Sequence, residues 1–220
     1  MKMMFFRNGV FRPIVLATAT LVLAGCCLIP HNEVSAPRSM SQAAADDRTM
    51  GDPNAPVVFV EYASPICPHC AHFASNGLPT LKEEYIDKGK VYFIFRVFPL
   101  SAVDGAVEAI GRCLPREQYF SFMDMMFRNQ SEWDPDGYEI PDVHAALIKM
   151  AGRAGMSQDK AEACIGNRQE MDRINAAAQD AVDKYNVNAV PTFVINGKVI
   201  QGFSGWPQLK AEIDALLPKQ

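Results

Sequence analysis

Two apolar runs near residue 60 and residue 95 predict the first strands of a sheet. Val57–Tyr62 and Lys90–Phe98 are rich in β-branched and aromatic residues, as buried strands are. Between them, residues 68–88 predict a helix. We expect that helix to be kinked near Pro79, because an interior proline removes a helical hydrogen bond.

The rest of the chain predicts a helical block followed by a hairpin and a last helix. Residues 103–186 show apolar positions at helical spacing, interrupted by proline and glycine. In residues 192–200, Asn-Gly separates two apolar runs, which is typical of a hairpin with a type I′ turn. Residues 206–217 are amphipathic. The pattern predicts one α/β domain over residues 51–217, with a helical insertion between a βαβ half and a ββα half.

The first 25 residues have the pattern of an export signal. A basic start without acidic residues precedes the apolar run Ile14–Leu23, which is too short for a stable membrane span. Leu-Ala-Gly-Cys26 resembles the lipobox of bacterial lipoproteins, in which the cysteine is lipidated. An ordinary signal peptide cleaved nearby is the alternative. Residues 26–50 have little apolar periodicity and are expected to be a flexible tether.

Charge and hydropathy exclude some classes of partner. The net charge is −4, and it becomes more negative once the basic first segment is removed. An acidic body argues against a nucleic-acid partner. After the signal, no apolar run reaches membrane-spanning length.

The motif Cys67-Pro68-His69-Cys70 stands where a predicted strand gives way to a helix. The free N–H groups and the dipole of a helix N-terminus favour a thiolate, so we expect a lowered pKa for Cys67. Cys70 lies almost one turn later, within bonding reach. Pro68 suits a first helical turn, and the ring of His69 can donate to the Cys67 sulfur or place a positive charge beside it.

The same Cys-x-x-Cys spacing also occurs in zinc sites, so metal binding is the alternative to redox chemistry. A closed zinc site usually needs a second ligand pair. In this sequence, Cys113 and Cys164 are isolated and His144 stands alone. Redox chemistry is therefore favoured, and no metal or other cofactor is expected.

Three segments carry a resemblance to a known family. Glu61–Cys70 resembles the active-site segment of the DsbA family of disulfide donors, and residues 51–57 and Asn188–Gly197 resemble two further parts of that domain. The resemblance covers nearly all of residues 51–217. It implies a thioredoxin-like fold with a helical insertion and a thiol:disulfide oxidoreductase activity.

The resemblance also implies roles for residues outside the motif. In the family, the proline matching Pro191 is cis and faces the redox pair, and a valine before it, here Val190, is common in oxidases. The acid matching Glu61 is buried below the active site and moves protons to and from the second cysteine. The alternative is an edge-strand carboxylate facing water. Arg96 is a candidate charge partner for Glu61, with an exposed residue at the end of its strand as the alternative.

The sequence contains six cysteines, and four lie outside the motif. Some relatives in the family carry a second disulfide in the helical region, and an exported compartment lets disulfides persist. We therefore expect Cys113 and Cys164 to form a structural disulfide, with two buried free thiols as the alternative. If Cys26 is lipidated, Cys27 is left unpaired.

The sequence thus indicates a lipid-anchored protein of the bacterial periplasm that donates the Cys67–Cys70 disulfide to unfolded or nascent exported proteins with thiols. The resemblance implies a quinone-linked membrane reoxidant of the DsbB kind. A monomer is expected, and the sequence does not separate the inner from the outer membrane. Two alternatives remain: a reductase or isomerase of the same fold, and a tethered chaperone whose cysteines are only structural.

Overall fold

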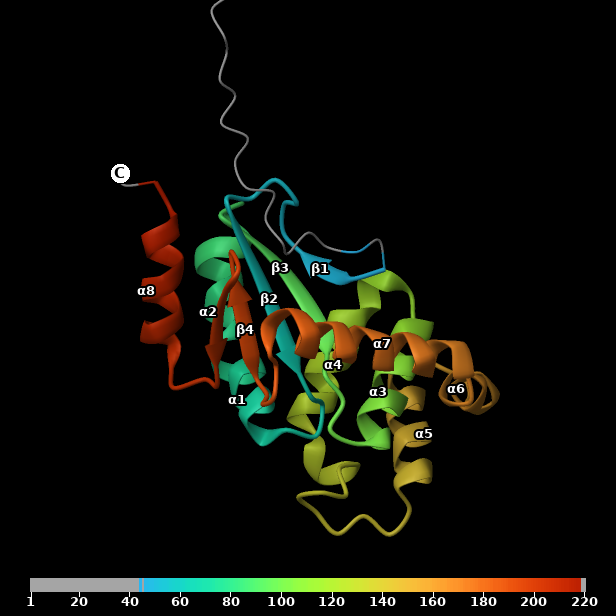
Figure 1. Cartoon of the computed structure of the whole chain (residues 1–220). Coiled ribbons are helices and arrows are strands. Elements are labelled where there is room, and N and C mark those ends of the chain that lie inside the picture. The colour runs from blue at the N-terminus through green and yellow to red at the C-terminus, as the bar shows by residue number, and fades with distance from the viewer. Residues whose placement is uncertain (1–43, 45, 219–220) are drawn as a thin grey trace, which may run out of the picture. The chain divides into compact units, whose positions relative to one another are not determined.

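The strands form one mixed sheet at the centre of the fold (Figure 1). The structure is a computed structural model that describes residue 44 and residues 46–218. Within these residues the strand order is β1-β3-β2-β4-β5, and β2 pairs with β3 in parallel while the other pairs are antiparallel. The strands are β1 (Arg48–Met50), β2 (Val57–Ala63), β3 (Val91–Val97), β4 (Thr192–Ile195) and β5 (Lys198–Gln201).

The helix predicted over residues 68–88 is divided into three pieces. These are α1 (Pro68–Asn76), α2 (Leu78–Leu81) and a π-helical turn (Lys82–Ile86). The break falls at Gly77, where a methyl group would overlap the ring of Phe73. Pro79 lies in the first turn of α2, where its missing N–H has no cost. The expected kink at the proline is therefore a helix break two residues earlier.

The helical insertion lies between β3 and β4 along the chain. Ser101 caps its first helix and forms a reciprocal capping box with Asp104. Its helices are α3 (Ala102–Cys113), α4 (Tyr119–Arg128), α5 (Val143–Arg153), α6 (Gln158–Ile165) and α7 (Arg168–Tyr185), with short 3₁₀ turns at Arg116–Gln118 and Gln130–Glu132.

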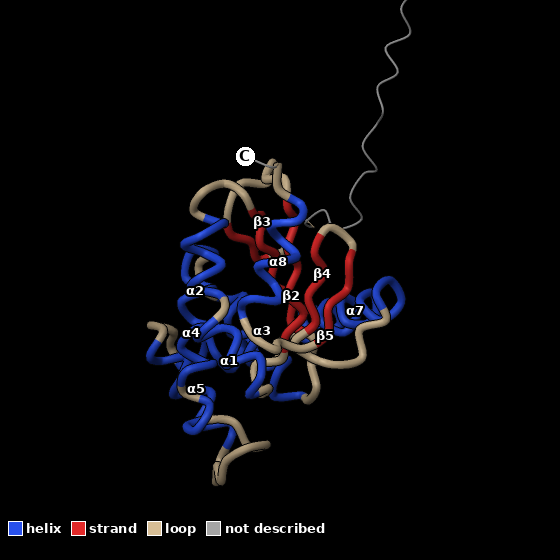
Figure 2. Tube along the Cα trace, turned by 90° about the vertical axis from the view of Figure 1, so that its left-hand side faces the viewer, coloured by secondary structure: helices blue, strands red, loops and turns tan. Residues whose placement is uncertain are grey.

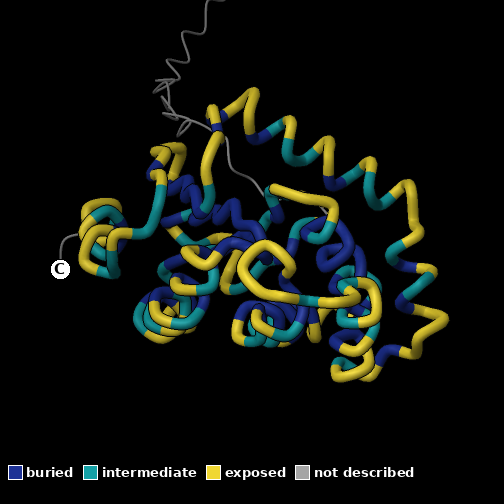
Figure 3. Tube along the Cα trace, turned by 90° about the horizontal axis from the view of Figure 1, so that it is seen from below, coloured by how far each residue is buried: buried dark blue, intermediate teal, exposed yellow. Residues whose placement is uncertain are grey.

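The helices cover both faces of the sheet. Figure 2 shows the strands between α7 and the layer that contains α1, α2 and α4. The smaller apolar cluster joins the sheet to α7 through Ala181 and Tyr185. The larger cluster joins the other face to α1, α4 and the final helix α8 (Trp206–Leu216). In Figure 3 the buried positions lie in the interior and the exposed positions on the outer faces of the helices.

Two local predictions can be compared directly with the backbone. The hairpin turns at Asn196 and Gly197, which have φ angles of 45° and 89°, as a type I′ turn requires. The expected tether, residues 26–50, extends too far, because residues 48–50 form β1 at the edge of the sheet. Arg48 also donates to the carbonyl oxygen of Arg112, so this segment is attached to α3 as well.

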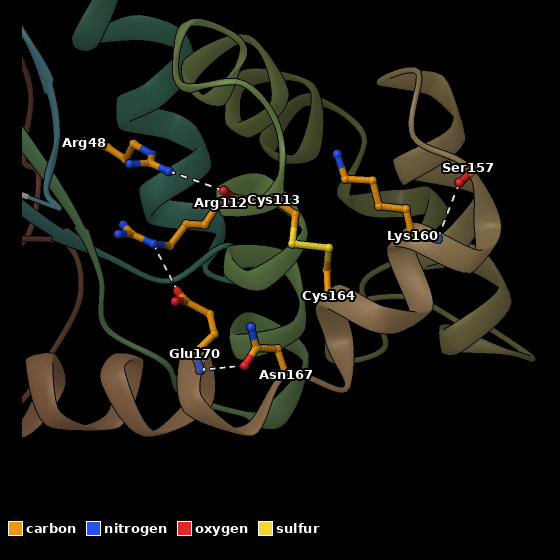
Figure 4. Close-up of a disulfide and its surroundings, with 8 residues drawn as sticks. All are labelled: Arg48, Arg112, Cys113, Ser157, Lys160, Cys164, Asn167 and Glu170. Carbon is orange, nitrogen blue, oxygen red and sulfur yellow. Dashed lines mark hydrogen bonds and ion pairs between the residues drawn. A yellow bond between two sulfur atoms is a disulfide. The ribbon is translucent and has the colours of Figure 1, made fainter.

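A disulfide connects α3 to α6 (Figure 4). It joins Cys113 to Cys164 across 51 positions of sequence. Next to it, the guanidinium of Arg112 pairs with Glu170 of α7 at 3.0 Å. Covalent and ionic contacts therefore hold together three helices that share no sheet ladder.

Replacing Cys113 and Cys164 together by alanine should destabilise the chain. Closing a loop of this length removes unfolded-state entropy equivalent to about 4 kcal/mol, and strain commonly reduces the gain, so we expect a loss of about 2–4 kcal/mol. Urea denaturation of the oxidised wild type and variant measures the difference. An unchanged free energy of unfolding would contradict a structural role for the bond.

Candidate active site

The sequence places Cys67 at the N-terminus of α1. Cys67 is the capping residue with extended backbone angles, and Pro68 begins the helix. No side-chain oxygen caps this helix. Instead, the backbone N–H groups of His69 and Cys70 donate to the Cys67 sulfur. The sulfur thus takes the place of a capping oxygen, and a thiolate satisfies those donors best.

The two cysteines of the motif have opposite acidities. The thiol of Cys70 donates to Cys67 and, with the two N–H groups and the charge of His69, lowers the pKa of Cys67 to about 6 against the opposing effect of burial. The pKa of Cys70 is raised, first by its complete burial and then by its bond to Cys67 and the charges of Cys67 and Glu61. Cys67 is therefore the more acidic thiol of the pair, and Cys70 is the thiol that holds its proton more strongly.

His69 acts on Cys67 through its position more than through a ring contact. Its side chain is exposed, and the hydrogen bonds found among the described residues include none from its ring to Cys67. What reaches the sulfur is the backbone N–H of His69 and the charge of the ring, which contributes least to the shift.

The loop before β4 lies beside the reactive sulfur. The Val190–Pro191 peptide bond is cis, as the resemblance implies. In its protonated form, Cys67 donates to the carbonyl oxygen of Val190 across 3.7 Å. The carbonyl oxygen of Pro191 accepts from Gly202, and the hydroxyl of Thr192 donates to Ala189, both at 2.7 Å. These bonds fix the backbone that faces Cys67.

Two buried side chains, which the sequence analysis did not predict, fix the loop that precedes Cys67. Asp104 accepts from the hydroxyl of Ser64 at 2.9 Å and from the backbone N–H of Ile66 at 3.0 Å. The side-chain amide of Gln130 donates to the carbonyl oxygen of Pro65 at 2.7 Å. Only the capping box at Asp104 leaves a local trace in the sequence, since the other contacts join residues far apart.

Glu61 lies on β2 with 1% of its surface exposed. Burial, and then the charge of Cys67, raise its pKa well above the usual range of a glutamic acid. Its charge in turn raises the pKa of Cys70, so the two groups interact. A carboxylic acid whose pKa is raised by burial is suited to exchanging protons with a thiol.

The candidate charge pair between Glu61 and Arg96 does not form, and Arg96 is not an exposed strand-end residue either. Arg96 donates to Asp47 at 2.7 and 3.0 Å and to the hydroxyl of Tyr62 at 3.0 Å. Tyr62 faces Arg96 across the parallel β2–β3 pair, and neighbouring residues of a strand point to opposite faces. Arg96 therefore lies on the face opposite Glu61.

The predictions for the N-terminal segment concern residues that the structure does not describe. The export signal of residues 1–25 and the lipidation candidate Cys26 lie outside the described residues, as does Cys27. Within the described residues, no three side chains of His, Cys, Asp or Glu come together as a metal site would require.

Comparison with known proteins agrees with this geometry. Residues 43–215 match the family model described as thioredoxin. The crystal structure of α-DsbA1 from Wolbachia pipientis is 30% identical, with a TM-score of 0.71 over 79% of this chain and 92% of that one. Oxidised BdbD from Bacillus subtilis, at 21% identity and a TM-score of 0.68 over 80% and 95% of the two chains, shares the fold.

Relatives found by sequence comparison are described as proteins that form or exchange disulfides. A putative protein-disulfide oxidoreductase of Rickettsia bellii is 25% identical over 72% of this chain, and a probable disulfide bond formation protein D of Bacillus cereus is 27% identical over 80% of this chain and 82% of its own length. This chain spans 60% of the length of the Rickettsia protein. The chain belongs to the thioredoxin family and, within it, to the DsbA type, which confirms the predicted fold class and resemblance.

Replacing Glu61 by leucine should stabilise the oxidised protein, and the gain should grow with pH. The folded-state pKa of Glu61 is raised, so its ionisation opposes folding from about pH 4.5 upward and most strongly above the folded pKa. Leucine does not ionise and leaves no buried oxygen unpaired. We expect a gain of about 1–3 kcal/mol at pH 8 and a smaller one at pH 4.

Urea denaturation of the disulfide form at the two pH values measures this difference without titrating cysteines. Glu83→Leu, at an exposed acid of the neighbouring π-helical turn, is the matched control. An equal gain in the free energy of unfolding at both pH values would show that the ionisation of Glu61 does not destabilise the fold.

Proposed function

We propose that this protein is a thiol:disulfide oxidoreductase that donates the Cys67–Cys70 disulfide to other proteins. The observation that carries the proposal is the division of acidity between the two sulfurs, with the pKa of Cys67 lowered to about 6 and that of Cys70 raised. A stabilised thiolate favours the reduced form of the pair, so the disulfide form is a ready oxidant. The names of the relatives support the same activity.

The transfer proceeds in two exchanges. A substrate thiolate attacks the Cys67 sulfur, a mixed disulfide forms, and the bond to Cys70 breaks. Cys70 leaves as a thiolate and takes a proton, for which Glu61 is the buried acid coupled to it. A second substrate thiolate then attacks the substrate sulfur, and Cys67 departs as the thiolate that the helix stabilises. Two electrons have passed from the substrate thiols to the cysteine pair.

The substrate in this proposal is an unfolded or nascent exported protein with free thiols. The Val190–Pro191 segment lies beside the Cys67 sulfur, and because proline has no N–H of its own, a substrate backbone in this proposal pairs with Val190 alongside it. A quinone-linked membrane protein of the DsbB kind would accept the two electrons from Cys67 and Cys70 and restore the disulfide. A reductase or isomerase of the same fold would use the same residues and differ in redox potential.

The proposed place of action is the bacterial periplasm, with the chain anchored through a lipid on Cys26 and active as a monomer. The sequence Leu-Ala-Gly-Cys26 supports the anchor. Among the helices of the described residues, none combines the length and apolar character needed to cross a membrane.

The thiol chemistry can be tested on the sulfurs separately. Thiolate absorbance of the reduced protein should show a midpoint near pH 6 that Cys67→Ser abolishes. The oxidised wild type should oxidise a reduced peptide, Cys67→Ser should not, and Cys70→Ser should stall as a mixed disulfide on Cys67. Equilibration with glutathione should give a potential more oxidising than the roughly −270 mV of thioredoxin.

Each result has a defined alternative. A potential at or below that of thioredoxin would indicate a reductase. A wild type without transfer activity, together with a Cys67→Ser variant that still protects substrates from aggregation, would indicate a chaperone. A Cys67 pKa near 8.5, the value of a free thiol, would remove the basis of the proposal.

Replacing Cys26 by alanine should release the protein from membranes or block its processing, because the lipid acceptor is lost. Membrane fractionation of cells that express each form is the measurement, and Cys27→Ala is the control for the neighbouring thiol. A Cys26→Ala chain that fractionates as the wild type does would contradict the anchor.

A further inference from the structure

A cavity of about 320 Å³ has Glu61 of β2 in its lining. The rest of the lining comes from β1, β3, α1, α2, the neighbouring π-helical turn and α4, and α1 packs against α4. Ser121, Lys82 and Asp124 are polar lining residues that are exposed or half-buried. The apolar lining is made chiefly of Met50, Leu78, Phe95, Phe120, Met123 and Phe127.

Glu61 differs from the other buried acids in having an oxygen without a partner. Asp104 accepts from four groups, and Glu108 is bonded to Tyr119, Arg112 and Arg173. Among the described residues, Oε1 of Glu61 has no hydrogen-bond partner, although the side chain is 99% buried. Buried polar atoms are nearly always paired, so this oxygen needs an explanation, and a bound molecule that donates to it would supply one.

We propose that this cavity, the Glu61 pocket, binds a small apolar molecule with a terminal hydroxyl group that donates to Oε1 of Glu61. The volume falls in the lower range of small-molecule sites, which are mostly apolar with a few polar groups that fix orientation. The wall of phenylalanine and methionine side chains takes the apolar part, and Oε1 takes the hydroxyl.

The chemistry of the pocket favours a neutral donor over a cation. An ammonium group would have to leave water for a wall of aromatic and thioether side chains. It would also require Glu61 to ionise in a buried position, and burial raises the pKa of that acid. A hydroxyl group satisfies Oε1 whether Glu61 is protonated or not, and it brings no net charge into the pocket.

The lining includes neither cysteine of the motif, so a bound molecule would not contact the redox pair directly. It would affect the cysteines only through Glu61, which lines the pocket. The site is thus separate from the Val190–Pro191 segment proposed for substrates. Binding does not depend on the proposed activity, so it can be measured on the full chain with the Cys67–Cys70 disulfide formed.

Two probes of matched shape test the site: phenylpropanol with its hydroxyl at the chain end, and propylbenzene. Chemical shifts of backbone amides in the full chain, followed during titration, should saturate around Ala74, Phe95 and Phe127. Phenylpropanol should bind the wild type roughly five- to tenfold more tightly, the gain of one hydrogen bond to a buried acceptor. In Glu61→Leu the preference should reverse in favour of propylbenzene, because the hydroxyl would be buried without a partner.

A second pair of variants keeps the test valid if Glu61→Leu does not fold. Ser121→Trp adds a large side chain at an exposed lining position and should abolish binding of both probes. Gln179→Trp, at an exposed position of α7 away from the pocket, should leave both affinities unchanged.

Three outcomes would overturn the proposal. The first is the absence of saturable binding by either probe. The second is a preference for the alcohol that persists in Glu61→Leu. The third is that a peptide without cysteine shifts the signals of the Glu61 pocket while neither probe does, since the pocket would then serve a peptide side chain.

Discussion

The carboxylate of Asp104 joins the loop that ends β2 to the loop that begins α3, and the position of Cys67 depends on that junction. Its oxygens accept from the N–H of Ile66, the hydroxyl of Ser64 and the N–H groups of Leu100 and Ser101. Burial raises the pKa of Asp104, and these donors oppose the rise. Ile66 directly precedes Cys67, so this bond sets where the first helical N–H groups meet the sulfur.

The two buried acids near the motif serve different ends because their surroundings differ. Asp104 is surrounded by donors, which makes its buried oxygens part of the framework. Glu61 has an oxygen without a partner among residues 46–218 and lines a mostly apolar pocket, so the balance between its charged and neutral forms is sensitive to its neighbours. The charge of Glu61 is one of the causes that raise the pKa of Cys70, so a change in the ionisation of Glu61 changes the acidity of the Cys70 thiol.

Local patterns in the sequence predict the elements that bring the site together, but not the contacts that hold it. The strands around Phe59 and Phe93, the start of α1 and the Asn196–Gly197 turn follow from periodicity and turn chemistry. β1 has three residues and pairs with a strand far along the chain, so it leaves no periodic signal. The contact between Asp104 and Ser64 spans 40 positions, and the partner of Arg96 depends on strand register, which sequence alone does not supply.

The two cysteine pairs of the described chain stand at opposite ends of helices, and this explains why only one is suited to exchange. Cys67 caps the start of α1, where N–H groups and the positive end of the helix dipole stabilise a thiolate. Cys113 is the last residue of α3, and Cys164 is the next-to-last residue of α6. There the unpaired groups are carbonyl oxygens and the dipole is negative, so a thiolate is disfavoured. Reduction of Cys113–Cys164 therefore lacks the stabilisation that makes Cys67–Cys70 a good donor, and the bond is better suited to holding the insertion together.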